Sequence, residues 1–174
     1  ADQLSRWVDW DDRRTCVLFG DGAAAVAVQA CAAEDTGLLG FRMRSDGRRN
    51  ACLTLAQSGH REPLLGHLSA QKGGFAPIQM NGQEVYKFAV REVPQILEEL
   101  LEHTGTRPEQ LDWLLLHQAN QRILDAVAER FAMPPEQVLS NLAHYGNTSA
   151  ATIPLMLDEA VRDGRVQAGH LLAS

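Results

Sequence analysis

Cysteines are scarce in this sequence, and their spacing excludes two kinds of site. The 174-residue chain has 3 cysteines, at positions 16, 31 and 52. An odd and sparse set does not form a disulfide framework, and it indicates a reducing compartment, for which the cytoplasm is the expectation. None of the cysteines has the Cys-x-x-Cys spacing of a zinc site. Because Cys16 and Cys31 have apolar or small neighbours, we expect both to be buried structural thiols.

Long apolar runs and an excess of positive charge are also missing. No apolar run approaches the roughly 18 residues of a membrane span, and the first residues show no signal-peptide pattern. The formal net charge of -6 argues against general nucleic-acid binding, which needs a basic face. The sequence therefore predicts no membrane and no nucleic-acid partner, although an acidic protein could dock on a local basic patch.

Metal-ligand and phosphate-loop patterns are absent as well. No nearby carboxylate or thiol completes a ligand set around His60 or His67, so we expect solvated loop histidines and no metal. Gly20-Asp21-Gly22 lacks the lysine and the following helix of a phosphate loop. Glycines inside a strand pattern indicate instead a bulge or a close approach of two backbones.

What is present is an alternation of strand-like and helix-like segments, which predicts an α/β fold. Strand patterns cover residues 15–19, 23–30, 36–44, 111–116, 138–142 and 166–172. Apolar stripes at helical spacing predict helices over residues 85–101, 123–131 and 153–161. Residues 45–80 are rich in glycine and proline and are expected to form irregular loops.

Local signals set the expected ends of the helices. Pro94 should kink the first helix or split it, and Gly105 should end it. Thr148 or Ser149 offers a side-chain cap to the last helix.

Two polar loops in the second half of the chain share a repeat. Residues 106–120 aligned with residues 133–147, an offset of 27, give 6 identities in 15 positions. Each unit reads as a turn, a short buried strand, a polar loop and a helix, and successive units of this kind place their strands in parallel. Their loops then leave the same edge of the sheet, where open α/β folds have their sites. His117 and Asn147 are therefore expected to face one cleft, unless the repeat serves packing alone or arose by chance.

A histidine and an asparagine together suit the stabilisation of a negatively charged carbonyl oxygen. Histidine can act as base, acid, ligand or donor, and the asparagine amide offers two donors and never titrates. Two donors aimed at a developing oxyanion are worth several kcal/mol. On local chemistry alone, His117 fits a core or supporting position equally well, and Asn147 after Gly146 fits a turn.

Basic side chains stand on the helices around the first loop. Lys87 precedes it, and Arg122 and Arg130 follow it. These residues are either an ordinary solvated face or a small cationic lip for a phosphate or an acidic protein, whose binding would weaken with salt.

Several motifs taken together resemble the β-ketoacyl-[acyl-carrier-protein] synthase III family. They are residues 117–120 (His-Gln-Ala-Asn), 146–151 (Gly-Asn-Thr-Ser-Ala-Ala) and 19–25 (Phe-Gly-Asp-Gly-Ala-Ala-Ala), supported by residues 82–87 and 157–164. Their joint order is the specific signal. The resemblance implies a thiolase-like layered fold, with a mixed sheet and helices on both faces. Plant-type polyketide and hydroxymethylglutaryl synthases share that fold, but the Gln-Ala-Asn and Asn-Thr-Ser-Ala-Ala spellings favour synthase III.

The resemblance implies roles for particular residues. His117 and Asn147 match two members of a Cys-His-Asn triad, which joins acetyl from acetyl-CoA to malonyl on acyl carrier protein and starts fatty-acid synthesis. CoA thioesters are substrates in this reaction, and no cofactor or metal is implied. The implied carrier-protein contacts are Gln118, Ala119, Asn120, Gln121, Arg122 and Lys87. The implied CoA and pantetheine contacts are Asn120, Gly82 and Gln83, although many members have asparagine in place of Gln83.

The chain departs from the family in length. The family enzyme is roughly double this length, and its first half carries the nucleophilic cysteine at a helix N-terminus. Residues 1–32 are expected to be the end of the amino-terminal half with its last strand, and residues 33–174 the carboxyl-terminal half without its final strand. We expect the chain alone to be inactive, its partners being the missing half, acetyl-CoA and acyl carrier protein, with a homodimer in the full enzyme. The alternative is a non-catalytic carrier-protein-binding subunit of the same fold.

Overall fold

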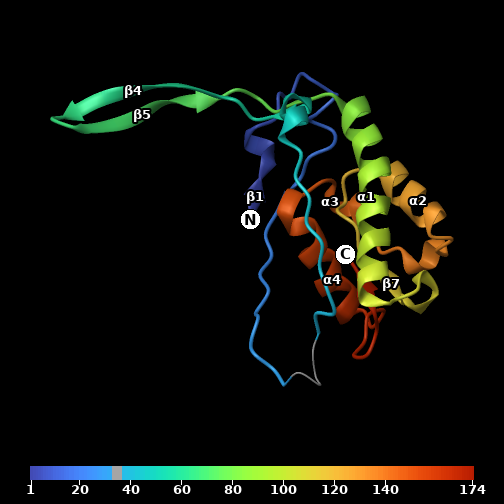
Figure 1. The fold of residues 1–174 in the computed structure, drawn as a ribbon. Coiled ribbons are helices and arrows are strands. Elements are labelled where there is room, and N and C mark those ends of the chain that lie inside the picture. Colours follow the sequence, from blue (N-terminus) through green and yellow to red (C-terminus); the bar gives the residue numbers. More distant parts are fainter. Residues whose placement is uncertain (33–36) are drawn as a thin grey trace.

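The computed structural model describes residues 1–32 and 37–174 of the chain. Figure 1 shows helices gathered around a small central sheet, with one long hairpin standing away from them. The α-helices are α1 (Gly82–Thr104), α2 (Gln121–Arg130), α3 (Leu142–Tyr145) and α4 (Thr152–Arg162). The strands are β1 (Asp2–Gln3), β2 (Asp21–Gly22), β3 (Leu53–Thr54), β4 (Gln57–Leu65), β5 (Leu68–Phe75), β6 (Gln79–Met80), β7 (Trp113–Leu114) and β8 (Leu172–Ala173). Single 3-10 turns include η3 (Gly47–Cys52), η4 (Pro108–Gln110), η5 (Pro135–Gln137) and η6 (Ser149–Ala151).

The core is a parallel sheet between helices, as the α/β expectation requires. β7 pairs in parallel with β8, and Val138 bridges to Leu114 in parallel on the other side. Side chains alternate across this sheet. Leu114 and Leu116 pack with α1 and α2, whereas Leu115 packs with Met156 of α4. Helices therefore cover both faces, and the unbroken apolar run of residues 113–116 reflects this two-sided burial.

Helix α1 ends at Gly105 as predicted, but it begins at Gly82, before the predicted start at residue 85. The Asn81 side chain accepts a hydrogen bond from the Glu84 backbone N–H at the start, and Gly105 ends the helix with a φ of 66°. Pro94 lies inside a single 23-residue helix, so the expected split does not occur. Pro94 is itself buried, and packing of α1 against α2 holds the helix together around the lost backbone bond.

The expectation of irregular loops over residues 45–80 is wrong. β4 and β5 form an antiparallel hairpin whose register shifts between Pro63 and Leu65. This hairpin projects from the rest of the molecule (Figure 1). His60 and His67 are exposed on it, as predicted for solvated histidines. Four of the residues that suggested loops, Gly59, Pro63, Gly73 and Gly74, lie within the strands, because an exposed two-stranded hairpin tolerates glycine and proline at its edges.

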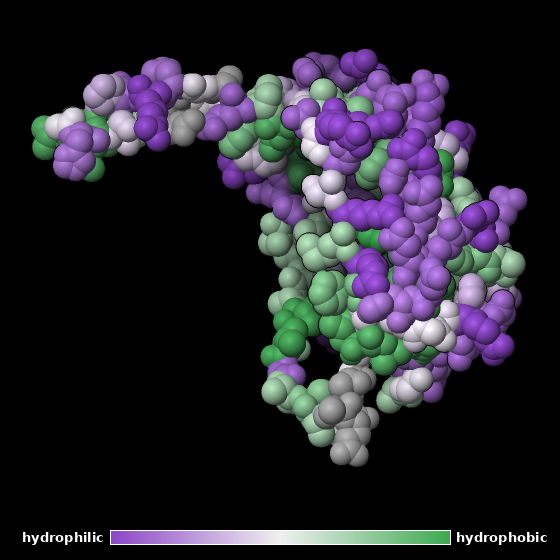
Figure 2. Space-filling model, in the orientation of Figure 1, coloured by the Kyte–Doolittle hydropathy of each residue, from purple (hydrophilic) through white to green (hydrophobic). Residues whose placement is uncertain are grey.

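The prediction of strands at residues 15–19, 23–30 and 36–44 is also wrong. Residues 15–18 form turns, residues 23–32 and 38–46 belong to no strand, and residue 36 lies outside the described residues. Apolar side chains along both segments are exposed, such as Val28 at 91% and Met43 at 85%, and Figure 2 shows apolar surface along this side. A strand needs a neighbour, and the described residues provide none here.

Cysteine burial differs from the expectation in the same region. Cys31 is exposed and Cys16 is only half-buried, because Cys31 lies in a stretch, residues 23–32, in which every side chain is exposed. Among the described residues, no helix is long and apolar enough to cross a membrane.

The two repeated segments, residues 106–120 and 133–147, have similar structures at their starts and ends but differ in between. The 3-10 turns η4 and η5 occupy equivalent positions, and each leads into a parallel strand position. The strands are shorter than predicted, and residues 142–145 form the helix α3 where the first unit is extended. The two final asparagines behave alike, since Asn120 and Asn147 each accept a hydrogen bond from the backbone N–H two residues ahead.

Candidate active site

A chain of hydrogen bonds joins the two predicted loops. The His117 Nδ1 atom lies 2.7 Å from Thr152 Oγ1. Thr152 Oγ1 lies 2.9 Å from the Ser149 carbonyl oxygen, and the Ser149 N–H donates to Asn147 Oδ1 at 2.9 Å. His117 and Asn147, which are 30 residues apart in sequence, are thus connected through two intervening residues.

The histidine stands at the carboxyl end of the strand run that carries β7. Buried Leu116 precedes His117, whose side chain reaches the surface. Although one edge of the imidazole meets water, surrounding protein removes part of its hydration and lowers the pKa of His117 below the ordinary 6.5. Desolvation therefore favours a neutral ring.

The tautomer of His117 depends on one hydroxyl hydrogen. If Thr152 donates to the Ser149 carbonyl, its oxygen must accept from a protonated Nδ1. If Thr152 turns to donate to Nδ1, the neutral ring carries its hydrogen on Nε2. The second arrangement gives the open edge of the ring a hydrogen-bond donor.

The backbone of Asn147 is clamped by the segment that begins the Gly-Asp-Gly motif. The Asn147 N–H donates to the Leu18 carbonyl, and the Gly20 N–H donates to the Asn147 carbonyl, both at 2.9 Å. A Cβ atom at Gly20 would lie 2.0 Å from the Tyr145 carbonyl oxygen. The predicted close approach of backbones at this glycine is confirmed, and its consequence is a fixed position for Asn147.

The turn around Asn147 has unusual backbone angles. Gly146 has a φ of 66° and a ψ of -156°, a region that is open in practice to glycine alone. Ser149 has a φ of 54°, in the left-handed region. The cap that Thr148 or Ser149 was expected to give the last helix does not form, since neither η6 nor α4 has a side-chain cap hydrogen bond. The Ser149 N–H instead donates to Asn147 Oδ1. Because Asn147 Oδ1 accepts this bond, the amide hydrogens on its Nδ2 are the atoms left to serve a ligand.

Gln118 does not lie on the surface. Its side chain is 0% exposed, and its amide hydrogen bonds run to neighbouring strand ends and to residues 140 and 141. The predicted contact of this side chain with a carrier protein is therefore corrected, since no partner can reach it.

The other predicted contacts lie around the start of α2 and of α1. Asn120 caps α2 by accepting from the Arg122 N–H, and Gln121 and Arg122 are exposed on its first turn, after half-buried Ala119. Gly82 and Gln83 form the exposed first turn of α1. The two helices pack side by side (Figure 1).

The two basic side chains on these helices differ in their surroundings. Lys87 Nζ lies 3.0 Å from Glu84 Oε1, so its charge is partly balanced. Arg122 forms no ion pair with any residue in the described part of the chain. Arg130, the third member of the suggested lip, pairs with Glu98 at 2.8 Å. Arg122 is the member that is free to meet an acidic partner.

Two groups of residues that support the site carry no clear signal in the sequence. Thr152 is buried and contacts His117. Its position about one helical turn after Asn147 is the signal that could have identified it. Tyr145 Oη donates to Glu159 Oε1 at 2.5 Å, and Asn141 Nδ2 donates to Glu159 Oε2 at 3.0 Å. The Tyr145 bond, followed by that of Asn141, lowers the pKa of Glu159. Glu159 thereby ties α4 to the turn before Asn147.

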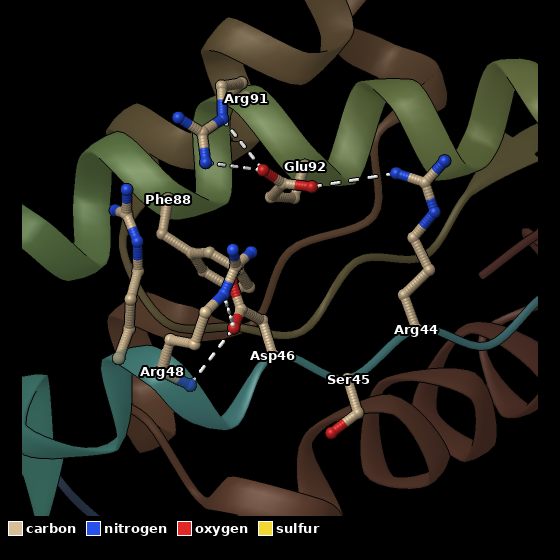
Figure 3. Close-up of a pocket in the computed structure, with 8 residues that line it drawn as sticks. Arg44, Ser45, Asp46, Arg48, Phe88, Arg91 and Glu92 are labelled. Carbon is tan, nitrogen blue, oxygen red and sulfur yellow. Dashed lines mark hydrogen bonds and ion pairs between the residues drawn. The ribbon is translucent and has the colours of Figure 1, made fainter.

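A cavity lined by arginines lies elsewhere in the molecule, and none of the site residues described above lines it. Its volume is about 690 Å³, and Figure 3 shows four guanidinium groups and Phe88 around it. Each guanidinium already has a carboxylate within 4 Å, through the pairs Arg44–Glu92, Arg48–Asp46, Arg49–Glu84 and Arg91–Glu92. The hydrogen bond from Arg48 lowers the pKa of Asp46 to about 2. Ion pairs therefore line the cavity, and Glu92 takes part in two of them. Within the described residues, no cluster of three or more metal-ligating side chains occurs.

Comparison with known proteins identifies the relatives of this arrangement. The model of the 3-oxoacyl-[acyl-carrier-protein (ACP)] synthase III C terminal matches residues 101–174, and the model of 3-oxoacyl-[acyl-carrier-protein (ACP)] synthase III matches residues 1–47. The beta-ketoacyl-[acyl-carrier-protein] synthase III of Synechococcus sp. (strain RCC307) is 71% identical over 174 residues, covering 100% of this chain and 52% of the relative. The corresponding protein of Prochlorococcus marinus (strain MIT 9313) is also 71% identical, with 51% of its length covered.

Solved structures give the same answer for the fold. The 3-oxoacyl-[acyl-carrier-protein] synthase III of Aquifex aeolicus VF5 superposes with a TM-score of 0.83 at 40% identity, over 97% of this chain and 49% of that structure. The synthase III of Pseudomonas aeruginosa PAO1 gives 0.82 at 37% identity, over 97% and 49%. The chain thus has part of a thiolase-like α/β fold.

The chain belongs to the 3-oxoacyl-[acyl-carrier-protein] synthase III family. It spans about half the length of the curated relatives it matches.

Proposed function

We propose that this chain supplies His117 and Asn147 to a decarboxylating Claisen condensation of acetyl-CoA with malonyl-acyl carrier protein. The observation that carries the proposal is the hydrogen-bond chain from His117 through Thr152 and Ser149 to Asn147. This hydrogen-bond chain links an imidazole to a carboxamide, and in the proposed reaction both offer N–H groups to the same oxygen. Family membership supports the choice of reaction.

The two donors act on the thioester carbonyl oxygen of the malonyl group. As the carbon–carbon bond to the carboxylate breaks, carbon dioxide leaves and the electron pair forms an enolate, whose charge sits on that oxygen. Donors from His117 Nε2 and Asn147 Nδ2 stabilise this charge, each by about 3 kcal/mol in a dry site. The enolate carbon then attacks an acetyl group held as a thioester on a cysteine, and the cysteine thiolate leaves. CoA thioesters are the substrates, and no cofactor takes part.

A neutral His117 donates from Nε2 when Thr152 holds its Nδ1. The lowered pKa of His117 supports the neutral ring, and the Thr152 hydroxyl lies close enough to Nδ1 to donate to it. When the Thr152 hydroxyl turns from the Ser149 carbonyl to donate to Nδ1, it selects the tautomer that this reaction requires.

The start of α2 forms the proposed carrier-protein surface. Arg122 is exposed without an ion pair among the described residues, which suits an acidic helix. The rest of this surface is Ala119, Asn120, Gln121 and Lys87, and the proposed pantetheine contacts are Asn120, Gly82 and Gln83. Arg122→Glu should weaken carrier binding at low salt, and the loss should shrink as salt is added, which a binding titration measures. Arg162→Glu, on the far helix α4 and paired with Asp158, is the matched control.

The nucleophilic cysteine comes, in this proposal, from a separate amino-terminal half. The half-length coverage of the relatives supports this division, as do the exposed apolar segments before and after residues 33–36. Residues 1–32 then complete that half, and residues 33–174 form the carboxyl-terminal half without its final strand. The assembled enzyme is proposed to be a cytoplasmic homodimer.

Complementation tests the proposal. The chain is mixed with the separately made amino-terminal half of the Synechococcus sp. (strain RCC307) relative, and formation of the condensed product from acetyl-CoA and malonyl carrier is measured. Activity should require both halves and should fall sharply with Asn147→Ala. Turnover by the chain alone would refute the division. Carrier binding with no activity in the mixture would instead favour a non-catalytic carrier-binding subunit.

A further inference from the structure

The buried amide of Gln118 lies between the two loops of the site. Its Nε2 donates to the Leu116 carbonyl at 2.8 Å and to the Leu139 carbonyl at 3.4 Å. Its Oε1 accepts from Ser140 Oγ at 2.9 Å and from the Asn141 N–H at 3.2 Å. A carboxamide has two donor hydrogens and two acceptor lone pairs, so all four are used.

Only one orientation of this amide satisfies its surroundings. Rotation by 180° would place Oε1 against the carbonyls of Leu116 and Leu139 and would point the NH2 group at the Asn141 N–H. Each buried backbone group would then face a group of its own kind, which is costly away from water. A fully satisfied buried network of this kind holds its members rigidly.

The four partners of Gln118 lead to both proposed catalytic residues. Leu116 directly precedes His117 in the chain. Asn141 begins α3, since its carbonyl accepts from the backbone N–H groups of His144 and Tyr145. Helix α3 ends at the turn that carries Asn147. The amide therefore joins the strand end that holds the imidazole to the helix that sets the position of the carboxamide.

We propose that Gln118 is a positioning residue that fixes the place of His117 relative to Asn147. The inference rests on the proposed function, in which both side chains act on one oxygen. If Gln118 served packing alone, an apolar side chain of similar size would replace it, since the site is fully buried. The hydrogen bonds, and not the volume, are what the proposal requires.

Hydrogen exchange and histidine titration in the 174-residue chain test this directly. Gln118→Met keeps the length of the side chain and removes all four bonds. We expect exchange of the Asn147 amide hydrogen, which is bonded to the Leu18 carbonyl, to speed up at least tenfold and the NMR titration midpoint of His117 to move. Gln167→Met is the matched control, because Gln167 also donates to a backbone carbonyl but is exposed beyond α4, and it should change neither quantity.

Gln118→Glu adds a readout that a packing role would not move. An ionised glutamate turns oxygens toward two carbonyls, whereas its protonated form regains one donor. Protection of the Asn147 amide, compared with the parent chain at each pH, should therefore recover as the pH falls. Gln167→Glu should show no such recovery.

Ser140→Ala keeps the test decisive if the Gln118 variants do not fold. It removes one of the four bonds at an exposed residue, and it should change Asn147 exchange in the same direction by a smaller factor. Unchanged exchange and an unchanged His117 midpoint in folded Gln118→Met or Ser140→Ala would overturn the proposal.

Assays with the complementary half separate this inference from the proposed function. Gln118→Met should lower kcat tenfold or more while KM for acetyl-CoA changes less than twofold. If the parent mixture has no activity, the proposed reaction fails, and exchange and titration still decide whether Gln118 positions the two loops.

Discussion

Apolar side chains are mostly buried in the residues that follow α1, whereas they are exposed in two segments that precede it. In the later region, Leu114, Leu124 and Met156 are almost entirely buried between helices and sheet. In the segments 23–32 and 37–46, side chains such as Val26 and Leu38 are more than half exposed, and no strand among the described residues pairs with them. Both regions have apolar sequences typical of a core. The difference teaches that the later region buries its apolar side chains against its own helices and strands, whereas the earlier segments find no such cover among the described residues.

The largest expected difference between the two regions comes from the same substitution, leucine to alanine, made once in each. Leu124→Ala should lower the free energy of unfolding by about 2–5 kcal/mol, because it leaves a cavity at a side chain that is 0% exposed. Leu38→Ala, at 73% exposed, should change it by less than about 0.5 kcal/mol. Urea denaturation of the chain measures both. Equal losses would show that residue 38 is buried in solution.

The contact between the early segment and the site gives the next largest effect. Gly20→Ala would force a Cβ to 2.0 Å from the Tyr145 carbonyl oxygen, so it should destabilise the chain by about 3 kcal/mol. Gly47→Ala meets no atom within 4 Å and should change stability by less than about 1 kcal/mol. Thermal and urea unfolding distinguish the two, and a harmless Gly20→Ala would mean that residues 18–20 do not clamp Asn147.

In the region after α1, a valine at position 152 would remove the Thr152 hydroxyl and keep the shape of the side chain. Thr152→Val should cost about 1–2 kcal/mol, because it leaves the Ser149 carbonyl and His117 Nδ1 without their shared partner. Thr152→Ser keeps the hydroxyl and should restore the His117 titration midpoint, followed by NMR. If the valine and serine variants titrate alike, the hydroxyl does not govern the ring.

The smallest expected effect is a pH dependence at His117. Its folded pKa lies below the ordinary 6.5, so between those two values the unfolded chain binds more protons than the folded chain. Stability is therefore full above about pH 6.5 and falls as the pH drops toward the folded pKa. His117→Gln should reduce the slope of unfolding free energy against pH in this window, whereas His60→Gln, on the exposed hairpin, should leave it unchanged. An NMR midpoint for His117 at or above 6.5 would contradict the prediction.

Sequence patterns predicted much of the structure from α1 onward. The apolar stripes of α1 and α2, the end of α1 at Gly105 and the burial of Leu114 and Leu115 on opposite faces of the sheet were all confirmed, because each signal concerns contacts that this chain makes. The same reasoning failed at residues 15–30, 38–44 and 57–75. There the alternation of apolar residues says which side chains prefer burial but not what lies beside them.

Within the candidate site, the sequence identified His117 and Asn147 by their motifs and by the repeat, yet it assigned Gln118 to the surface. Neighbours in a loop look alike in sequence, and only packing shows that the Gln118 amide turns inward between two strand ends. Thr152 had no motif at all. Its importance comes from a 2.7 Å approach across 35 residues.

The amino-acid sequence by itself determined the helices α1, α2 and α4, the buried apolar run at residues 113–116 and the family, because these depend on local spacing and on residue identity. The tertiary structure alone decided which polar groups meet. Hydrogen bonds such as those of Thr152 with His117, or of Gln118 with Asn141, depend on positions to within tenths of an ångström. Such positions result from the packing of α1, α2 and α4 around the sheet as a whole.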